Sequence, residues 1–63
     1  MELGKIIAGG GCGENDCPAI ALAGDGMLDV QGYQQPGVET PTGEAVVRIP
    51  AALILEAARA LGG

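Results

Sequence analysis

Glycine and proline interrupt this chain so often that every regular element in it must be short. The 63 residues include twelve glycines and four prolines. Glycine loses more backbone entropy than other residues when a helix or strand holds it, and proline lacks the N–H that a central strand needs. The uninterrupted stretches predict strands over 18–23, 27–33 and 45–49 and a helix over 51–61.

The local signals between these stretches predict how they connect. Gly24-Asp25-Gly26 separates the first two strands, and residues that accept positive φ suit the primed turns of tight hairpins. Pro50 precedes a run of strong helix formers that ends at Gly62-Gly63, which is the usual order of start and stop signals for a helix. We therefore expect an α+β fold: a small antiparallel β-meander of three strands, or four if residues 1–8 form one, packed on a C-terminal α-helix.

A chain of this length has room for one small domain. We divide it into a Gly-rich lead over 1–17, the meander over 18–49 and the helix over 50–61. Within the lead, residues 1–7 form either an edge strand or one frayed helical turn, and we favour the extended form. Alternation along the strands and helix periodicity predict a core formed by Ile20, Leu22, Leu28, Val30, Val47, Ile49, Leu53, Ile54, Ala57 and Leu61. Such a core is small, so we expect self-association or a partner.

The second face of the predicted sheet is too apolar to be fully hydrated and too polar to be a core. It carries Ala19, Ala21, Met27, Tyr33 and Val46, interrupted by Asp29, Gln31 and Arg48. One interpretation is that the N-terminal segment covers this face; the other is that the face binds a partner. In the second case the apolar contacts are Met27, Tyr33 and Val46, surrounded by the carboxylates of Asp25, Asp29, Glu39 and Glu44.

Charge and composition narrow the class of partner. The net charge is −5 and Tyr33 is the only aromatic residue, which argues against direct binding of nucleic acid. A negative surface suits a basic protein, although charge also serves solubility. The chain has no histidine and no serine, so we expect no enzyme and no cofactor. The absence of a signal-peptide pattern and of a long apolar stretch predicts a cytoplasmic protein without a membrane partner.

Both cysteines lie in the stretch GGGCGENDCP, as Cys12 and Cys17. Three hypotheses apply to them. The pair forms a short-loop disulfide, which a reducing cytoplasm disfavours. Alternatively they bind zinc, which would need Glu14 and Asp16 or a second subunit to complete four ligands. In the third, Cys17 is a small packed residue and Cys12 lies in a loop. The first two hypotheses define an alternative function for the chain, that of a thiol-based redox or zinc-binding module. A second alternative is a purely structural homo-oligomeric unit.

The order of these motifs resembles a known family. The motifs are a Gly-rich lead, Asp16-Cys17 at the start of a strand, Gly43-Glu44-Ala45-Val46-Val47 in a later strand, and Ile49-Pro50 before a short helix. In this order they resemble those of small acidic actinobacterial proteins with an uncharacterised domain. These proteins are commonly encoded beside helix-turn-helix regulators of the XRE type, and they are similar to the small acidic partners of developmental regulators of the WhiJ type. The resemblance implies a protein that binds a basic regulator as an antitoxin or antagonist.

Overall fold

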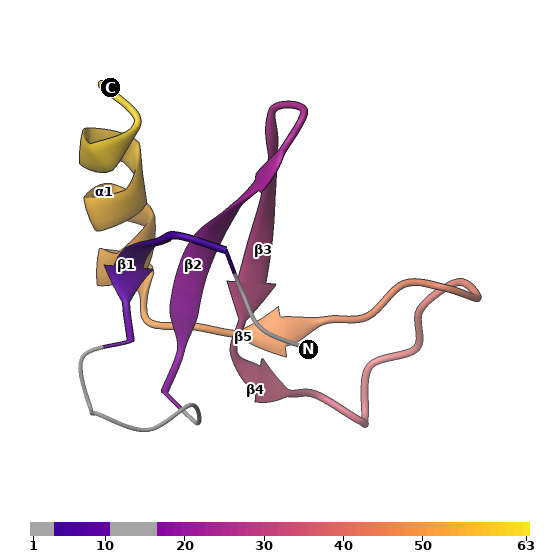
Figure 1. Cartoon of the computed structure of the whole chain (residues 1–63). Helices are drawn as coiled ribbons and strands as arrows, with labels where there is room; N and C mark the ends of the chain where they lie inside the picture. The colour runs from indigo at the N-terminus through magenta and orange to yellow at the C-terminus, as the bar shows by residue number, and fades with distance from the viewer. Residues whose placement is uncertain (1–3, 11–16) are drawn as a thin grey trace.

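Three antiparallel strands form the main sheet of the computed structural model, which describes residues 4–10 and 17–63 (Figure 1). Their order in the sheet is β1-β2-β3, and a second sheet pairs β4 with β5 before the helix α1. The bounds are β1 Ile6–Gly9, β2 Ala19–Gly24, β3 Met27–Gln31, β4 Tyr33–Gln34, β5 Val47–Arg48 and α1 Ala51–Ala60. The predicted α+β class, with antiparallel strands and one C-terminal helix, is confirmed.

The third strand of the main sheet differs from the predicted one. It is β1, the optional fourth strand expected within 1–8, which pairs with β2, whereas we expected 45–49 to be the third strand of this sheet. The predicted strand over 27–33 is divided at Gly32 into β3 and β4, and β5 pairs with β4. The chain entering α1 passes very close to this division. A Cβ added to Gly32 would lie 2.6 Å from Ile49 Cγ2 and 2.7 Å from Arg48 O, so only glycine fits there.

We predict that Gly32→Ala destabilises the fold by about 1–3 kcal/mol, because its methyl group would push apart two backbone segments. Urea denaturation followed by far-ultraviolet circular dichroism measures the loss. The matched control is Gly37→Ala, since an added Cβ at Gly37 would have nothing within 4 Å. Equal stability of the two variants would show that the close crossing at Gly32 does not constrain the fold.

The hairpin between β2 and β3 has the predicted turn. Asp25 and Gly26 have φ of 53° and 75°, which is the signature of a type I′ turn, and its twist matches that of the flanking strands. In the register that follows, Ile20 lies opposite Val30 and Leu22 lies opposite Leu28. These four side chains therefore share one face of the sheet.

The helix has the predicted boundaries to within one residue. Pro50 is its N-cap, in an extended conformation, and Leu61 is its C-cap. Gly62, at a φ of 88°, donates its N–H to Arg59 O, and Gly63 donates to Ala58 O at 2.8 Å. This pair of bonds is a Schellman motif, which satisfies carbonyls at the end of the helix. The two terminal glycines thus have the C-capping role expected from the sequence.

The core is smaller than predicted because α1 lies over β1 and β2 and leaves β3 uncovered (Figure 1). It consists of Ala8, Ile20, Leu53 and Ala57, with Ile7 and Ile49 packed against it. An irregularity between Ile6 and Ala8 lets consecutive residues of β1 reach this cluster. The prediction was therefore wrong for the members that stay exposed: Leu22, Leu28, Val30, Val47, Ile54 and Leu61.

On the other face of the main sheet, Ala19 and Ala21 are almost completely buried. Ile6 of β1 lies opposite Ala21 in the register. The expectation that both alanines contribute to an exposed interaction face was therefore wrong. The reason is that longer side chains of the neighbouring strands flank these methyl groups on the same face, with Ala21 between Ile6 and Asp29 and Ala19 opposite Gln31. Residues other than these two alanines must therefore form any exposed interaction surface.

Candidate protein-interaction surface

The second sheet and its connection form an extension of the molecule that we call the arm, residues 33–48. In Figure 1 it extends away from the main sheet and from α1. Except for the half-buried Gln35, all of its residues are exposed. The arm therefore contributes surface rather than core.

Its own hydrogen bonds hold the arm in shape. Gln35 N donates to Val46 O at 3.3 Å, which extends the pairing of β4 with β5. Two turns follow, closed by the bonds from Val38 N to Gln35 O and from Glu44 N to Pro41 O. Side chains reinforce both ends, because Gln35 Nε2 donates to Tyr33 O and Thr40 Oγ1 donates to Glu44 O, each at 2.9 Å. These bonds define the two turns of the arm and the pairing at its base.

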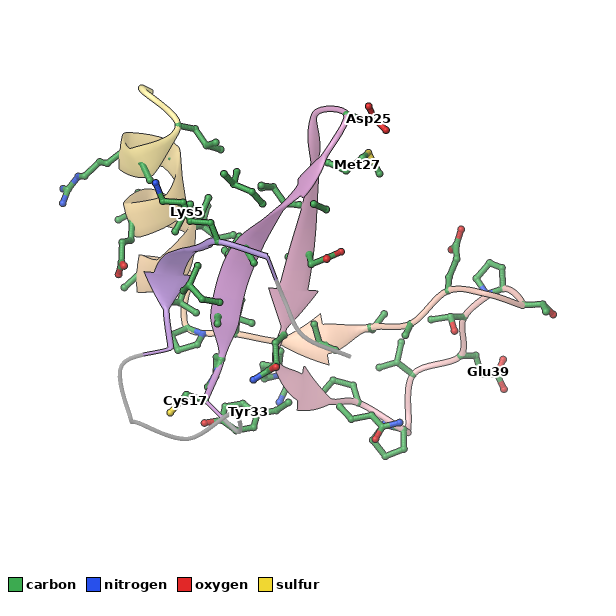
Figure 2. The ribbon with its side chains drawn as sticks, in the orientation of Figure 1. Lys5, Cys17, Asp25, Met27, Tyr33 and Glu39 are labelled. Carbon is green, nitrogen blue, oxygen red and sulfur yellow. The ribbon has the colours of Figure 1, made fainter. Side chains whose placement is uncertain are left out.

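The arm exposes several apolar side chains, two carboxylates and the guanidinium of Arg48. Tyr33 is 58 % exposed and lies opposite Arg48 in the register of β4 and β5. Because side chains repeat every second residue along a strand, Val46 shares its face with Arg48 and therefore with Tyr33. The carboxylates of Glu39 and Glu44 lie on the connection between the two strands, and both residues are exposed. The arm thus carries Tyr33, Glu39, Glu44 and Val46, more than half of the predicted partner-binding residues, but Tyr33 lies at its base, well away from Glu39 (Figure 2).

The remaining predicted residues lie on the main sheet. Asp25 and Met27 are at the tip of the β2–β3 hairpin, far from Glu39 on the arm, as Figure 2 shows. Asp29 is half-buried in β3, opposite Ala21. The seven residues therefore do not form one cluster, because the chain changes sheets at Gly32 between Asp29 and Tyr33 and because Tyr33 lies far from Glu39 (Figure 2).

Sequence reasoning missed two exposed apolar residues of the arm, Val38 and Val47. We assigned Val47 to the core because it alternates with Val46 along the expected third strand of the meander. Val38 lies in a proline- and glycine-rich connection, where isolated apolar residues carry no periodic signal. A valine between turn residues in a long connection was the only indication available.

The cysteine hypotheses are partly resolved. Cys17 is disulfide-bonded, so it is not the packed free thiol that one of them described. Its carbonyl accepts a hydrogen bond from Gln31 Nε2 at 2.7 Å, which ties the residue to the end of β3. Cys12 is the other cysteine of the chain; it lies outside the described residues, as do Glu14 and Asp16, and the Cys12–Cys17 pairing stays a prediction.

Two further findings concern metal binding and membrane insertion. Within 4–10 and 17–63, no three histidine, cysteine or acidic residues gather as metal ligands would. In the same part of the chain, α1 is too short to cross a membrane.

Comparison with protein-family models, curated proteins and solved structures finds no match for this chain.

Proposed function

We propose that this chain is a non-enzymatic protein-interaction module, the acidic partner of a basic helix-turn-helix transcriptional regulator, which it antagonises or neutralises as an antitoxin does. The observation that carries the proposal is the arm. It exposes Tyr33 at its base and Val38, Val46, Glu39 and Glu44 along the rest of its length, and its own hydrogen bonds close its turns. The resemblance of the sequence to acidic partners of such regulators supports the same function.

The chemistry of the arm fits a basic protein surface. Tyrosine is a frequent anchor of protein interfaces, since its ring buries a large area at a small entropic cost. The two carboxylates would attract a cationic partner and accelerate the encounter, while the apolar side chains would hold the complex. A net charge of −5 reinforces this attraction at a distance and disfavours nucleic acid as the direct ligand.

Binding to a purified XRE-type regulator, encoded in the same genome, tests the proposal. We expect the Kd, measured by isothermal titration calorimetry, to rise at least tenfold between 50 and 300 mM NaCl because salt screens exposed charges. Tyr33→Ala should weaken binding about tenfold or more. Glu39→Gln combined with Glu44→Gln should weaken it about threefold to tenfold and reduce the salt dependence.

The matched control is Glu56→Gln, which removes a carboxylate from α1 rather than from the arm. Glu56 Oε2 accepts a hydrogen bond from Gly9 N at 3.2 Å, and the amide oxygen of glutamine can accept the same bond. We expect this variant to bind almost as tightly as the unmodified chain. The proposal fails if no complex forms with the regulator, or if Tyr33→Ala and the arm double variant bind as tightly as Glu56→Gln.

A further inference from the structure

The main sheet has an open edge along β3, which is the outermost strand of the order β1-β2-β3. Hydrogen bonds of β2 identify the backbone groups at this edge. Leu22 N donates to Lys5 O at 2.9 Å, so Leu22 directs its N–H and C=O toward β1. This direction alternates along a strand, so Ala21 directs its groups toward β3, where its register partner is Asp29. Asp29 in turn directs its groups back toward β2.

The two neighbours of Asp29 therefore direct their backbone groups away from the sheet. They are Leu28 and Val30, and each presents one N–H and one C=O at the open edge. Within residues 4–10 and 17–63, no segment bonds to these four groups. A row of free donors and acceptors along an edge strand is a template on which another strand can pair.

The side chains of β3 specify which kind of strand fits this edge. Asp29 shares a face with Ala21 and lies between it and the open edge. Its side chain is half-buried, and no lysine or arginine in the described part of the chain pairs with it. A residue added opposite Asp29 would place its side chain directly beside this carboxylate. Leu28 and Val30 lie on the other face and are 38 % and 44 % exposed, so residues added opposite them would gain apolar contacts.

We propose that the edge of β3 binds an extended segment of another protein, in which a lysine or arginine lies between two apolar residues. The cation would lie opposite Asp29, and the apolar residues opposite Leu28 and Val30. Antiparallel pairing would form four backbone hydrogen bonds, two at each outward-directed residue, while the ion pair would select the sequence. This edge belongs to the main sheet, so the inference does not rest on the function proposed for the arm.

A second copy of this chain fits the edge less well. If two copies of β3 paired so that each Leu28 lay opposite Val30 of the other copy, the two Asp29 side chains would be direct neighbours. Like charges in this position destabilise the pairing, and a charge within an edge strand commonly prevents self-association. Registers shifted by two residues would depend on Gly26 in the turn or on Gly32 after the end of β3. The carboxylate therefore favours a cationic segment.

Nuclear magnetic resonance of the isotopically labelled chain, titrated with the capped pentapeptide TVKVT, tests the inference without any regulator. In the free chain, we expect the amides of Leu28 and Val30 to exchange with heavy water at least about tenfold faster than that of Asp29, which is bonded to β2. Saturation with the peptide should slow both by at least about tenfold. The peptide TVEVT should bind about fivefold to tenfold more weakly. Methylation of both valine amide nitrogens should abolish binding, because these donors face the edge.

Asp29→Asn should weaken binding of TVKVT about threefold and remove its preference over TVEVT. The matched control is Asp25→Asn, because Asp25 is an exposed carboxylate just before β3 and asparagine tolerates its φ of 53°. This control should bind within about twofold of the unmodified chain. If Asp29→Asn does not fold, the methylated peptide decides.

Four results would overturn the inference. One is protection of the Leu28 and Val30 amides in the free chain, which would mean that a second copy already occupies the edge. The others are no binding at about 5 mM peptide, equal binding of the methylated peptide, and equal losses in Asp29→Asn and Asp25→Asn. None of these results bears on Tyr33, so they are distinguishable from a failure of the arm to bind a regulator.

Discussion

Gly9→Ala is expected to destabilise the protein by about 3 kcal/mol. Gly9 has a φ of 70°, a conformation that costs an alanine roughly 1–2 kcal/mol. Its added Cβ would also collide with Pro18 O and lie 2.9 Å from Leu53 Cδ2, and overpacking of this kind typically costs about 1–3 kcal/mol. A domain of 63 residues has a total stability of only about 3–9 kcal/mol, so much of the folded population would be lost.

Gly26→Ala separates the two contributions. Gly26 has a φ of 75°, but an added Cβ there would have nothing within 4 Å. We expect this variant to lose only about 1 kcal/mol, the contribution of the backbone conformation alone. Urea denaturation of both variants, followed by circular dichroism, measures the difference. Equal losses would mean that β1, β2 and α1 do not meet as closely at Gly9 as the structure has them.

Leu53→Ala is expected to have an effect of similar size, about 2–5 kcal/mol, because it removes the largest helix side chain of the core and leaves a cavity. Leu53 is 8 % exposed and packs with Ala8, Ile20 and Ala57. The surrounding alanines cannot fill the space. We expect the variant to be largely unfolded at 37 °C, as judged by its thermal denaturation curve.

Leu55→Ala is the control for this substitution, since it deletes the same side chain from the same helix at an exposed position. Its expected effect is within about 0.5 kcal/mol. Both variants must be compared at one protein concentration, because self-association shifts apparent stability. If Leu55→Ala were as destabilising as Leu53→Ala, the helix would pack on the sheet through a different face.

The candidate site was predictable in its residues more than in its arrangement. Exposed Tyr33 and Val46 and the carboxylates of Glu39 and Glu44 follow from charge, alternation and turn-rich connections. Their separation from Asp25 and Met27 does not, because it depends on the change of sheet at Gly32. The exposed Leu28 and Val30 were also assigned to the core, since alternation indicates a shared face but not whether a helix covers it.

Local rules within the sequence were enough to determine the hairpin at Gly24–Gly26, the boundaries of α1 and its glycine C-cap, because neighbouring residues alone set backbone conformation there. The choice of strand partners was decided only in the tertiary structure. An alternating segment can pair with any edge, so the sequence left open whether residues 1–8 join the sheet and did not show that β4 and β5 form a sheet of their own. That choice follows from contacts between distant segments, chiefly the close approach of Gly32 to Ile49 and of Gly9 to Leu53, and it determines which apolar side chains remain exposed.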